Sequence, residues 1–276
     1  MELRAFVEIT RPHNCLLAGI VGLLGSVVAV GHFPDPVTAL LVFLVVTLGC
    51  GGGNTINDYF DYEIDRINRP ERPIPRGAIE RRTARHYSLF LFGTGLLLAG
   101  FINLPSFLLA ALAYVMMVVY AWKLKPLPLL GNLVVAALTA ATPLYGALAV
   151  GRIGLAGYLA ICAFLVNVAR EIIKDVEDVE GDLIKGARTL PIVWGKKKAS
   201  YLGAFFAFLT VVASFLPVKA GVGPGYYAML PVDLMILYAG YLVLRNQDRE
   251  SAHRSQLILK LSIFLAVIAF MVAAIV

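Results

Sequence analysis

Charged residues are scarce in this sequence. They make up 15% of 276 residues, whereas a soluble domain carries about a quarter. Hydrophobic residues reach 59%, and the mean hydropathy is +0.78. The apolar residues form repeated runs of about twenty, the length of a membrane-spanning helix, whereas strands that cross a membrane are shorter and alternate in polarity. The composition therefore excludes an ordinary soluble domain and predicts an all-α membrane protein.

Cysteine and histidine are also few. The three cysteines, Cys15, Cys50 and Cys162, are far apart in apolar stretches, and the four histidines are dispersed. This spacing supports neither a disulfide framework nor a zinc, haem or diiron site. Any bound metal must then be held by oxygen atoms. The first residues, up to Asn14, contain no small-residue cleavage site, so we expect the N-terminus to be retained.

Nine apolar runs predict nine transmembrane helices in one polytopic bundle. They cover residues 13–31, 36–57, 84–102, 105–122, 132–151, 153–173, 198–218, 226–244 and 257–276. Glycine and proline mark the short connections between them. Two connections are longer, over residues 58–85 and 174–198. We therefore expect a single transmembrane domain over residues 1–276.

The basic residues predict the orientation of this bundle. Of 24 Lys and Arg, 22 fall on the side of the N-terminus and both long loops, and only Arg152 and Lys219 fall on the other side. Because cytoplasmic loops carry the excess of Lys and Arg, we expect these loops in the cytoplasm and the C-terminus outside the cell membrane. The same bias, together with anionic membrane lipids, explains the net charge of +6. It predicts no nucleic-acid partner, and no feature of the sequence predicts an obligate protein partner.

Acidic residues cluster in two segments that form an internal repeat. Of 18 Asp and Glu, six lie between Asp58 and Glu80, and six between Glu171 and Asp182. At an offset of 117 residues, segment 56–65 aligns with segment 173–182. Four acids coincide: Asp58 with Asp175, Asp61 with Asp178, Glu63 with Glu180, and Asp65 with Asp182. Because the two segments are four helices apart, they share one orientation, which predicts a duplicated bundle whose acidic segments face each other.

The spacing of these acids predicts a metal site. If the helices continue past the membrane surface, Asn57, Asp61 and Asp65 lie on one helical face. The same spacing relates the set Arg170, Lys174, Asp178 and Asp182. Carboxylates gathered on one face repel one another unless cations bridge them, and Mg²⁺ prefers oxygen ligands. Two such faces with nearby Arg and Lys would bind a diphosphate. The alternative is that both segments are solvated helix ends.

Three motifs carry a resemblance to a known family: Asn57-Asp58-x-x-Asp61-x-x-x-Asp65, Arg72-Pro73-Ile74-Pro75-Arg76-Gly77 and Asp178-x-x-x-Asp182. Together they resemble the UbiA superfamily of intramembrane prenyltransferases, over essentially the whole chain. Members of this family move a prenyl group from a prenyl diphosphate onto a lipid-soluble acceptor. The resemblance therefore implies these two substrates and Mg²⁺, which we expect as two ions.

The resemblance also implies roles for individual residues. The catalytic and metal-binding positions would be Asn57, Asp61, Asp65, Asp178 and Asp182. The expected substrate-binding positions are Arg11, Asn14, Arg72, Tyr120, Lys123, Lys125, Arg170, Lys174, Asp58 and Asp175. Arg76 stands where many members of the family have serine.

A narrower resemblance concerns the acceptor. The stretch Glu171–Asp182, followed by Gly186-Ala-Arg-Thr189-Leu-Pro191, resembles the archaeal branch of the family. That branch transfers a geranylgeranyl group to geranylgeranylglyceryl phosphate in ether-lipid synthesis. An aromatic or quinone-precursor acceptor is the alternative within the family.

Two other classes of membrane protein share some of these sequence features. The CDP-alcohol phosphotransferases also use Mg²⁺ and acidic residues, but their Asp-Gly-x-x-Ala-Arg opening is absent from the sequence. An ion-coupled transporter is the non-enzyme alternative, since internal repeats are common there. Its coupling acids would lie near the middle of the membrane, whereas the acids of this chain are at the ends of the predicted helices.

Overall fold

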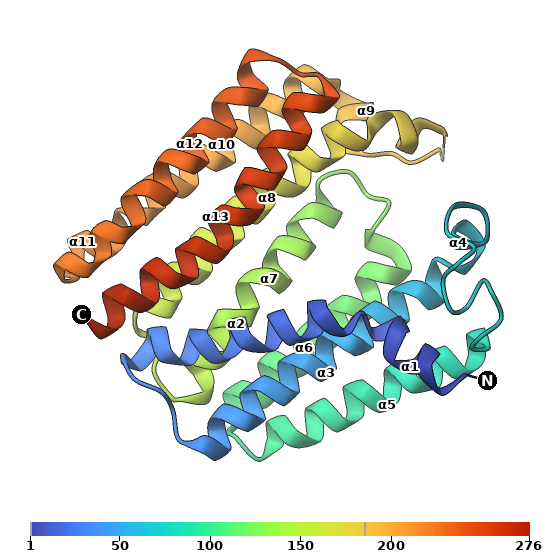
Figure 1. The fold of residues 1–276 in the computed structure, drawn as a ribbon, viewed down its shortest axis with the longest axis horizontal. Coiled ribbons are helices and arrows are strands. Elements are labelled where there is room, and N and C mark those ends of the chain that lie inside the picture. Colours follow the sequence, from blue (N-terminus) through green and yellow to red (C-terminus); the bar gives the residue numbers. More distant parts are fainter. Residues whose placement is uncertain (1, 185) are drawn as a thin grey trace.

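The computed structural model describes residues 2–184 and 186–276, and within them the chain is a helical bundle (Figure 1). The N-terminus, α4 (Tyr62–Asn68) and α9 (Leu190–Trp194) lie at one end of the bundle. The C-terminus and α11 (Leu216–Lys219) lie at the other. Both acidic segments are therefore at the end that holds the N-terminus, which we call the polar end.

The long helices run back and forth between these two ends. In chain order they are α2 (Pro12–Val30), α3 (Pro36–Phe60), α5 (Arg81–Gly100), α6 (Leu104–Val119), α7 (Leu130–Ala149), α8 (Gly154–Ile184), α10 (Lys196–Ser214), α12 (Leu230–Arg245) and α13 (Arg249–Ile275). Three short elements complete the chain, namely α1 (Leu3–Thr10), a π-helical turn η1 (Tyr120–Leu124) and a 3₁₀ segment η2 (Pro224–Met229). The predicted all-α polytopic bundle is thus confirmed.

The predicted number of nine spanning helices is close to what the structure shows. Eight helices in the described residues are long and apolar enough to cross a membrane. The ninth predicted helix, residues 84–102, corresponds to α5, which runs alongside α3 (Figure 1). Its first turns carry Arg81, Arg82 and Arg85, and these charges lower its hydropathy below that of the other eight.

Two helices extend beyond their predicted ends. The sequence predicts a helix over 153–173, but α8 continues to Ile184, which gives it a length of about 46 Å at 1.5 Å per residue. This exceeds the hydrocarbon thickness of about 30 Å, so the helix projects past the membrane. Similarly, α3 continues to Phe60 and is followed by α4 with only Asp61 between them. The acids of both segments are thus helical rather than in loops.

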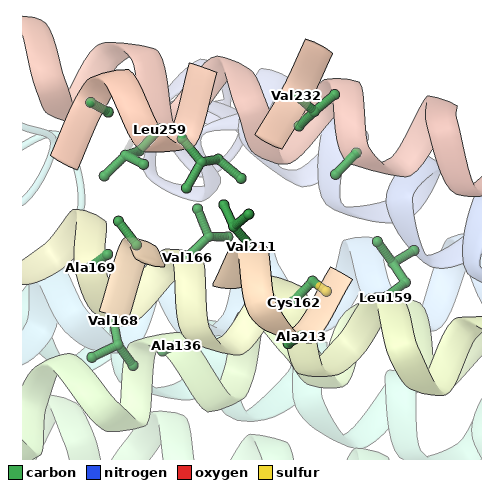
Figure 2. Close-up of a cluster of buried hydrophobic side chains, with 14 of the residues drawn as sticks. Ala136, Leu159, Cys162, Val166, Val168, Ala169, Val211, Ala213, Val232 and Leu259 are labelled. Carbon is green, nitrogen blue, oxygen red and sulfur yellow. The ribbon is translucent and has the colours of Figure 1, made fainter. Parts of the chain in front are cut away.

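The largest buried core lies between α8 and the helices around it. Leu159, Cys162 and Val166 of α8 belong to one cluster with residues of α10, α12 and α13. Figure 2 shows Val166 beside Val211 of α10, and Val168 on the other side of α8 near Ala136 of α7. Because α8 is covered on several sides, it forms the centre of the second half of the bundle and positions the second acidic segment.

Glycines let α2 and α7 cross at backbone contact. A Cβ atom on Gly146 of α7 would lie 2.0 Å from the carbonyl oxygen of Gly22 and 2.6 Å from the amide nitrogen of Ser26. On the other helix, a Cβ on Gly25 would lie 2.2 Å from the carbonyl oxygen of Pro143. Small residues are how membrane helices approach closely, since lipid provides no hydrophobic force between them. The crossing therefore fixes α2 against the middle of the bundle.

We expect Gly146→Ala to destabilise the protein by about 1–3 kcal/mol, because the added methyl group meets backbone that cannot move aside. Gly93→Ala is the matched control, since Gly93 is also in a helix and has nothing within 4 Å of its Cβ position. This control should be unchanged, or more stable by up to about 1 kcal/mol. Thermal unfolding in detergent measures both variants. Equal melting temperatures for the two would contradict a close crossing.

Candidate active site

The first acidic segment is one nearly continuous helix. Although α3 ends at Phe60, the backbone N–H of Asp61 still bonds the carbonyl of Asn57 at 2.9 Å, and the N–H of Asp65 bonds the carbonyl of Asp61 at 2.8 Å. This keeps Asn57, Asp61 and Asp65 in helical register, as their spacing predicted. The side-chain amide of Asn57 also donates to Asp61 Oδ2 at 2.8 Å.

Asp58 is the centre of the charge network in this segment. Its carboxylate is 4% exposed and accepts from Arg11 at 2.6 Å and from Arg72 at 3.1 Å, both on Oδ1. Arg72 also binds Asp65 Oδ2 at 2.5 Å. A buried carboxylate is costly unless cations neutralise it and hydrogen bonds reach it. The two guanidinium groups meet that requirement for Asp58, and Arg72 meets it for Asp65 as well.

Arg11 reaches this network from the junction between α1 and α2. It ends the first helix and begins the second in the left-handed conformation, with φ of 54°. Asn54 braces the junction: its amide donates to the Thr10 carbonyl at 2.8 Å, and its oxygen accepts from Arg11 at 3.4 Å. Since a residue with a side chain rarely adopts a positive φ, surrounding contacts must hold this turn in place.

Lys125 brings the connection between α6 and α7 to the first segment. Its ammonium group lies 2.5 Å from Asp61 Oδ2, directly after the π-helical turn Tyr120–Leu124. A π-helical turn carries one extra residue, which changes the direction of the side chains that follow it. We call the segment from Tyr120 to Asn132 the α6–α7 corner.

The same corner contacts the second acidic segment. Asn132, near the start of α7, donates from its amide to Asp175 Oδ2 at 2.9 Å. Tyr120, the first residue of the π-helical turn, belongs to the same corner. The corner therefore links the acids of both segments, one from each half of the bundle. It is still a prediction that the two segments face each other across one cavity.

The remaining predicted residues make fewer contacts with this network. Lys123 lies over the Trp122 ring, with its ammonium nitrogen 4.0 Å from the ring centre. Asn14 is exposed on the first turn of α2. Arg170 pairs with its neighbour Glu171, and its Nε atom is buried without a partner within the described residues. Lys174 and Asp178 are exposed on α8.

The far end of α8 carries the last predicted acid. Asp182 is partly buried there, and its backbone carbonyl accepts from the N–H of Ala187 at 2.9 Å. At the first segment, the structure thus brings seven of the predicted residues into side-chain contact with one another: Arg11, Asn57, Asp58, Asp61, Asp65, Arg72 and Lys125.

Three residues of the network were missed by the sequence analysis. Asn54 lies inside the predicted apolar run 36–57, and Asn132 is the first residue of the predicted run 132–151. Glu171 was seen only as one of many acids. A polar residue at the edge of an apolar run is a signal that could have identified Asn132, since such residues are costly in membranes and are often functional.

The donor atoms suit Mg²⁺ by their chemistry. Asn57, Asp61 and Asp65 of the first segment and Asp178 and Asp182 of the second offer only oxygen and amide groups. No group of three or more His, Cys, Asp or Glu side chains is assembled for a metal in the part of the chain that the structure describes. Instead, Arg11, Arg72 and Lys125 neutralise the first segment. The network thus contains hard oxygen ligands whose charge is balanced by cations of the chain.

We expect Arg72→Met to destabilise the protein by about 3–5 kcal/mol, because Asp58 and Asp65 are both buried and both lose a cation. Arg69→Met is the matched control on the same connection, where the arginine is exposed, and it should change stability by no more than about 0.5 kcal/mol. Thermal unfolding in detergent measures both. A similar melting temperature for the two variants would show that Arg72 is not required to neutralise these acids.

Comparison with known proteins extends this description. The chain is 73% identical over 274 residues to the digeranylgeranylglyceryl phosphate synthase of Thermococcus gammatolerans. This alignment covers 99% of each chain. It is also similar to a solved structure described as digeranylgeranylglyceryl phosphate synthase in membranes, with 36% identity and a TM-score of 0.91 over 99% of this chain and 98% of that one.

A more distant structure shares the fold. The UbiA homologue from Archaeoglobus fulgidus, bound to GPP and Mg²⁺, has 18% identity and a TM-score of 0.69, over 96% of this chain and 99% of that one. The model of the UbiA prenyltransferase family matches residues 18–273, which include both acidic segments and the α6–α7 corner. This chain is therefore a multi-pass membrane protein that belongs to the UbiA prenyltransferase family.

Proposed function

We propose that this prenyltransferase moves a geranylgeranyl group from its diphosphate to geranylgeranylglyceryl phosphate. The observation that carries the proposal is the α6–α7 corner, whose contacts with Asp61 and Asp175 support one site shared by the two acidic segments. The acceptor is inferred from the relative in Thermococcus gammatolerans, whose name describes this product and which aligns along almost the entire chain.

In this proposal, the cations of the chain bind the phosphate groups. Arg11, Arg72 and Lys125 are already held at the first acidic segment, and guanidinium groups pair with phosphate oxygens in two-pronged hydrogen bonds. Lys123, Arg170 and Lys174 are the further cations that we assign to the substrates. Tyr120 and Asn14 are assigned to substrate contacts near the same end. Cations fixed in advance stabilise the negative charge that grows on the diphosphate as the allylic C–O bond breaks.

We assign the metal to Asn57, Asp61, Asp65, Asp178 and Asp182. Asp58, which accepts from Arg11 and Arg72, and Asp175, which accepts from Asn132, are assigned supporting roles beside them. The Archaeoglobus fulgidus homologue is bound to Mg²⁺, which agrees with this set of oxygen ligands. Two Mg²⁺ ions would bridge the acids and the diphosphate, and would supply charge neutralisation to the leaving group. The protein's part is to hold the carboxylates at a helical spacing on both segments.

The domain organisation and the orientation in the membrane are part of the same proposal. We propose one domain over residues 1–276, in which segments 56–65 and 173–182 are the matching motifs of a duplicated bundle. We place the polar end in the cytoplasm, since 22 of the 24 Lys and Arg were assigned to that side. The opposite end, with the C-terminus, would then lie outside the cell membrane. The substrates and the surrounding lipids are the only partners that this function requires.

Two rival functions differ in a measurable way. An aromatic or quinone-precursor acceptor would use the same site for the diphosphate, but it would not need cations for a second phosphate group. An ion-coupled transporter would carry its acids near the middle of the membrane. In this chain, the acids of α4 and of the end of α8 lie at the polar end of the bundle (Figure 1), which favours an enzyme.

We expect purified protein to join geranylgeranyl diphosphate and geranylgeranylglyceryl phosphate when Mg²⁺ is present, and to stop when EDTA removes the metal. Asp61→Asn and Asp178→Asn should each lower kcat/KM about a hundredfold, or about 2.7 kcal/mol. The double variant should be little worse than either single one, because both residues serve one diphosphate. Product formation, followed with labelled diphosphate, measures all of these.

Glu63→Gln is the control for this series. Glu63 also belongs to the repeat, but its side chain is 68% exposed and pairs only loosely with Arg66 and Arg81, at 3.7 Å each. It should retain most of the activity. Transfer to an aromatic acceptor instead of the lipid phosphate would support the rival acceptor class, and full activity without metal would contradict the proposed site.

We expect the polar end to be reached only from the cytoplasm. A cysteine in place of Asn68 at the end of α4, in protein whose native cysteines are replaced, should react with a membrane-impermeant maleimide only when the inner face is accessible. A cysteine in place of Lys219 at the end of α11 should react only from the outer face. Labelling of both from one side would contradict the orientation.

A further inference from the structure

The N-terminal helix α1 has no role in the function proposed above. It is buried on one side only: Ala5 and Ile9 are buried, whereas Leu3 and Val7 are 89% and 57% exposed. Its buried side packs on the connection between α4 and α5 and on the first turn of α5, in a cluster with Ile74, Ala78, Ile79 and Ala84. Phe6 adds an edge-to-face contact with Tyr87, 5.0 Å between ring centres.

One two-pronged ion pair joins α1 to that connection. Arg76 donates to both carboxylate oxygens of Glu8, at 2.8 and 2.9 Å, and also to the carbonyl of Glu71 at 2.8 Å. The hydrogen bonds from Arg76 lower the pKa of the Glu8 carboxyl, so the pair stays charged at neutral pH. Parallel bonds between a guanidinium and a carboxylate fix orientation as well as distance. The pair therefore sets how α1 lies against the connection.

Both segments joined by this pair deliver an arginine to Asp58. On α1, Glu8 precedes Arg11 by three residues, and its carbonyl accepts the Arg11 N–H at 3.0 Å. On the connection, the N–H of Arg76 bonds the carbonyl of Arg72 at 3.1 Å. The contacts thus form a closed ring that runs through Asp58, Arg11, Glu8, Arg76 and Arg72.

The ring explains how the junction at Arg11 keeps its conformation. The positive φ of Arg11 is unfavourable for a residue with a side chain, and it persists only where neighbouring contacts impose it. Thr10, directly before Arg11, is held by Asn54, and Glu8, two residues earlier, is held by Arg76. If the Glu8 contact were lost, α1 could rotate and carry the Arg11 guanidinium away from Asp58.

We propose that the Glu8–Arg76 pair is a clasp that positions Arg11 and Arg72 around Asp58 and thereby sets the affinity of the site for the prenyl diphosphate. The proposal rests on the function proposed above. It gives Arg76 a role as a positioning residue, four residues after the arginine that contacts the acids. The clasp acts on the reaction only through Arg11 and Arg72, because the described contacts place neither Glu8 nor Arg76 against the acidic segments.

The test is a double-mutant cycle with Glu8→Gln, Arg76→Gln and the two combined. Each single variant should raise KM for geranylgeranyl diphosphate about tenfold and lower kcat by less than this, because the displaced arginines bind the diphosphate before they stabilise its developing charge. The double variant should match the single ones, because either change opens the same clasp. Arg76→Lys keeps the charge without the two-pronged geometry and should lie between wild type and Arg76→Gln.

Arg82→Gln is the matched control, since Arg82 is an exposed cation near the start of α5, and its KM should equal that of wild type. Single effects that multiply in the double variant would show that Glu8 and Arg76 act separately and would overturn the clasp. So would an unchanged KM in Glu8→Gln and Arg76→Gln.

Hydrogen exchange separates the clasp from the function on which it rests. In Glu8→Gln and Arg76→Gln, the amides of α1 should exchange faster than in wild type, while those of α8 stay unchanged. Faster exchange with an unchanged KM would reduce the pair to a structural contact and overturn the proposal. If the wild-type protein transfers no prenyl group, the proposed function fails, and the affinity of the same variants for geranylgeranyl diphosphate then decides the clasp by equilibrium binding.

Discussion

The buried carboxylate of Asp58 constrains the entire polar end of the molecule. It can remain charged at 4% exposure only because Arg11 and Arg72 neutralise it. Arg11 requires the sharp junction between α1 and α2, and Arg72 requires the connection after α4 to fold back over α3. The position of α1, the conformation at Arg11 and the path of the chain from Arg69 to Glu80 are thus consequences of one buried charge.

Much of the fold could be predicted from the sequence, because a membrane leaves few choices. Backbone groups in lipid must bond within their own helix, so apolar runs of sufficient length become spanning helices. The limits of this reasoning appear at α5 and α8. The charged residues in the first turns of α5 lower its mean hydropathy, so a hydropathy profile misses these turns. The helix α8 continues to Ile184 because its acidic segment contains no residue that ends a helix. A hydropathy profile identifies the membrane-spanning segments, whereas the full length of a helix also depends on residues outside the membrane.

The candidate site likewise contains residues that could be placed from the sequence and residues that could not. The repeat and its spacing depend on local helical geometry, so Asn57, Asp61 and Asp65 could be placed on one face from the sequence alone. The choice between Lys123 and Lys125 could not be made in this way, because it depends on the π-helical turn that precedes them. Asn132 was missed for a related reason: its partner Asp175 is 43 residues away, and only the packing of α7 on α8 brings the two together.

The close crossing of α2 with α7 has a consequence for the order in which the protein assembles. The helix α2 is the first long helix to leave the ribosome, yet it packs against α7, α8 and α13, the last of which ends at residue 275. Insertion of single helices and their later association are separable steps in a membrane. The glycine face of α2 therefore stays in lipid until α7 has been synthesised. Its bundle is completed only when the C-terminal helix has entered the membrane.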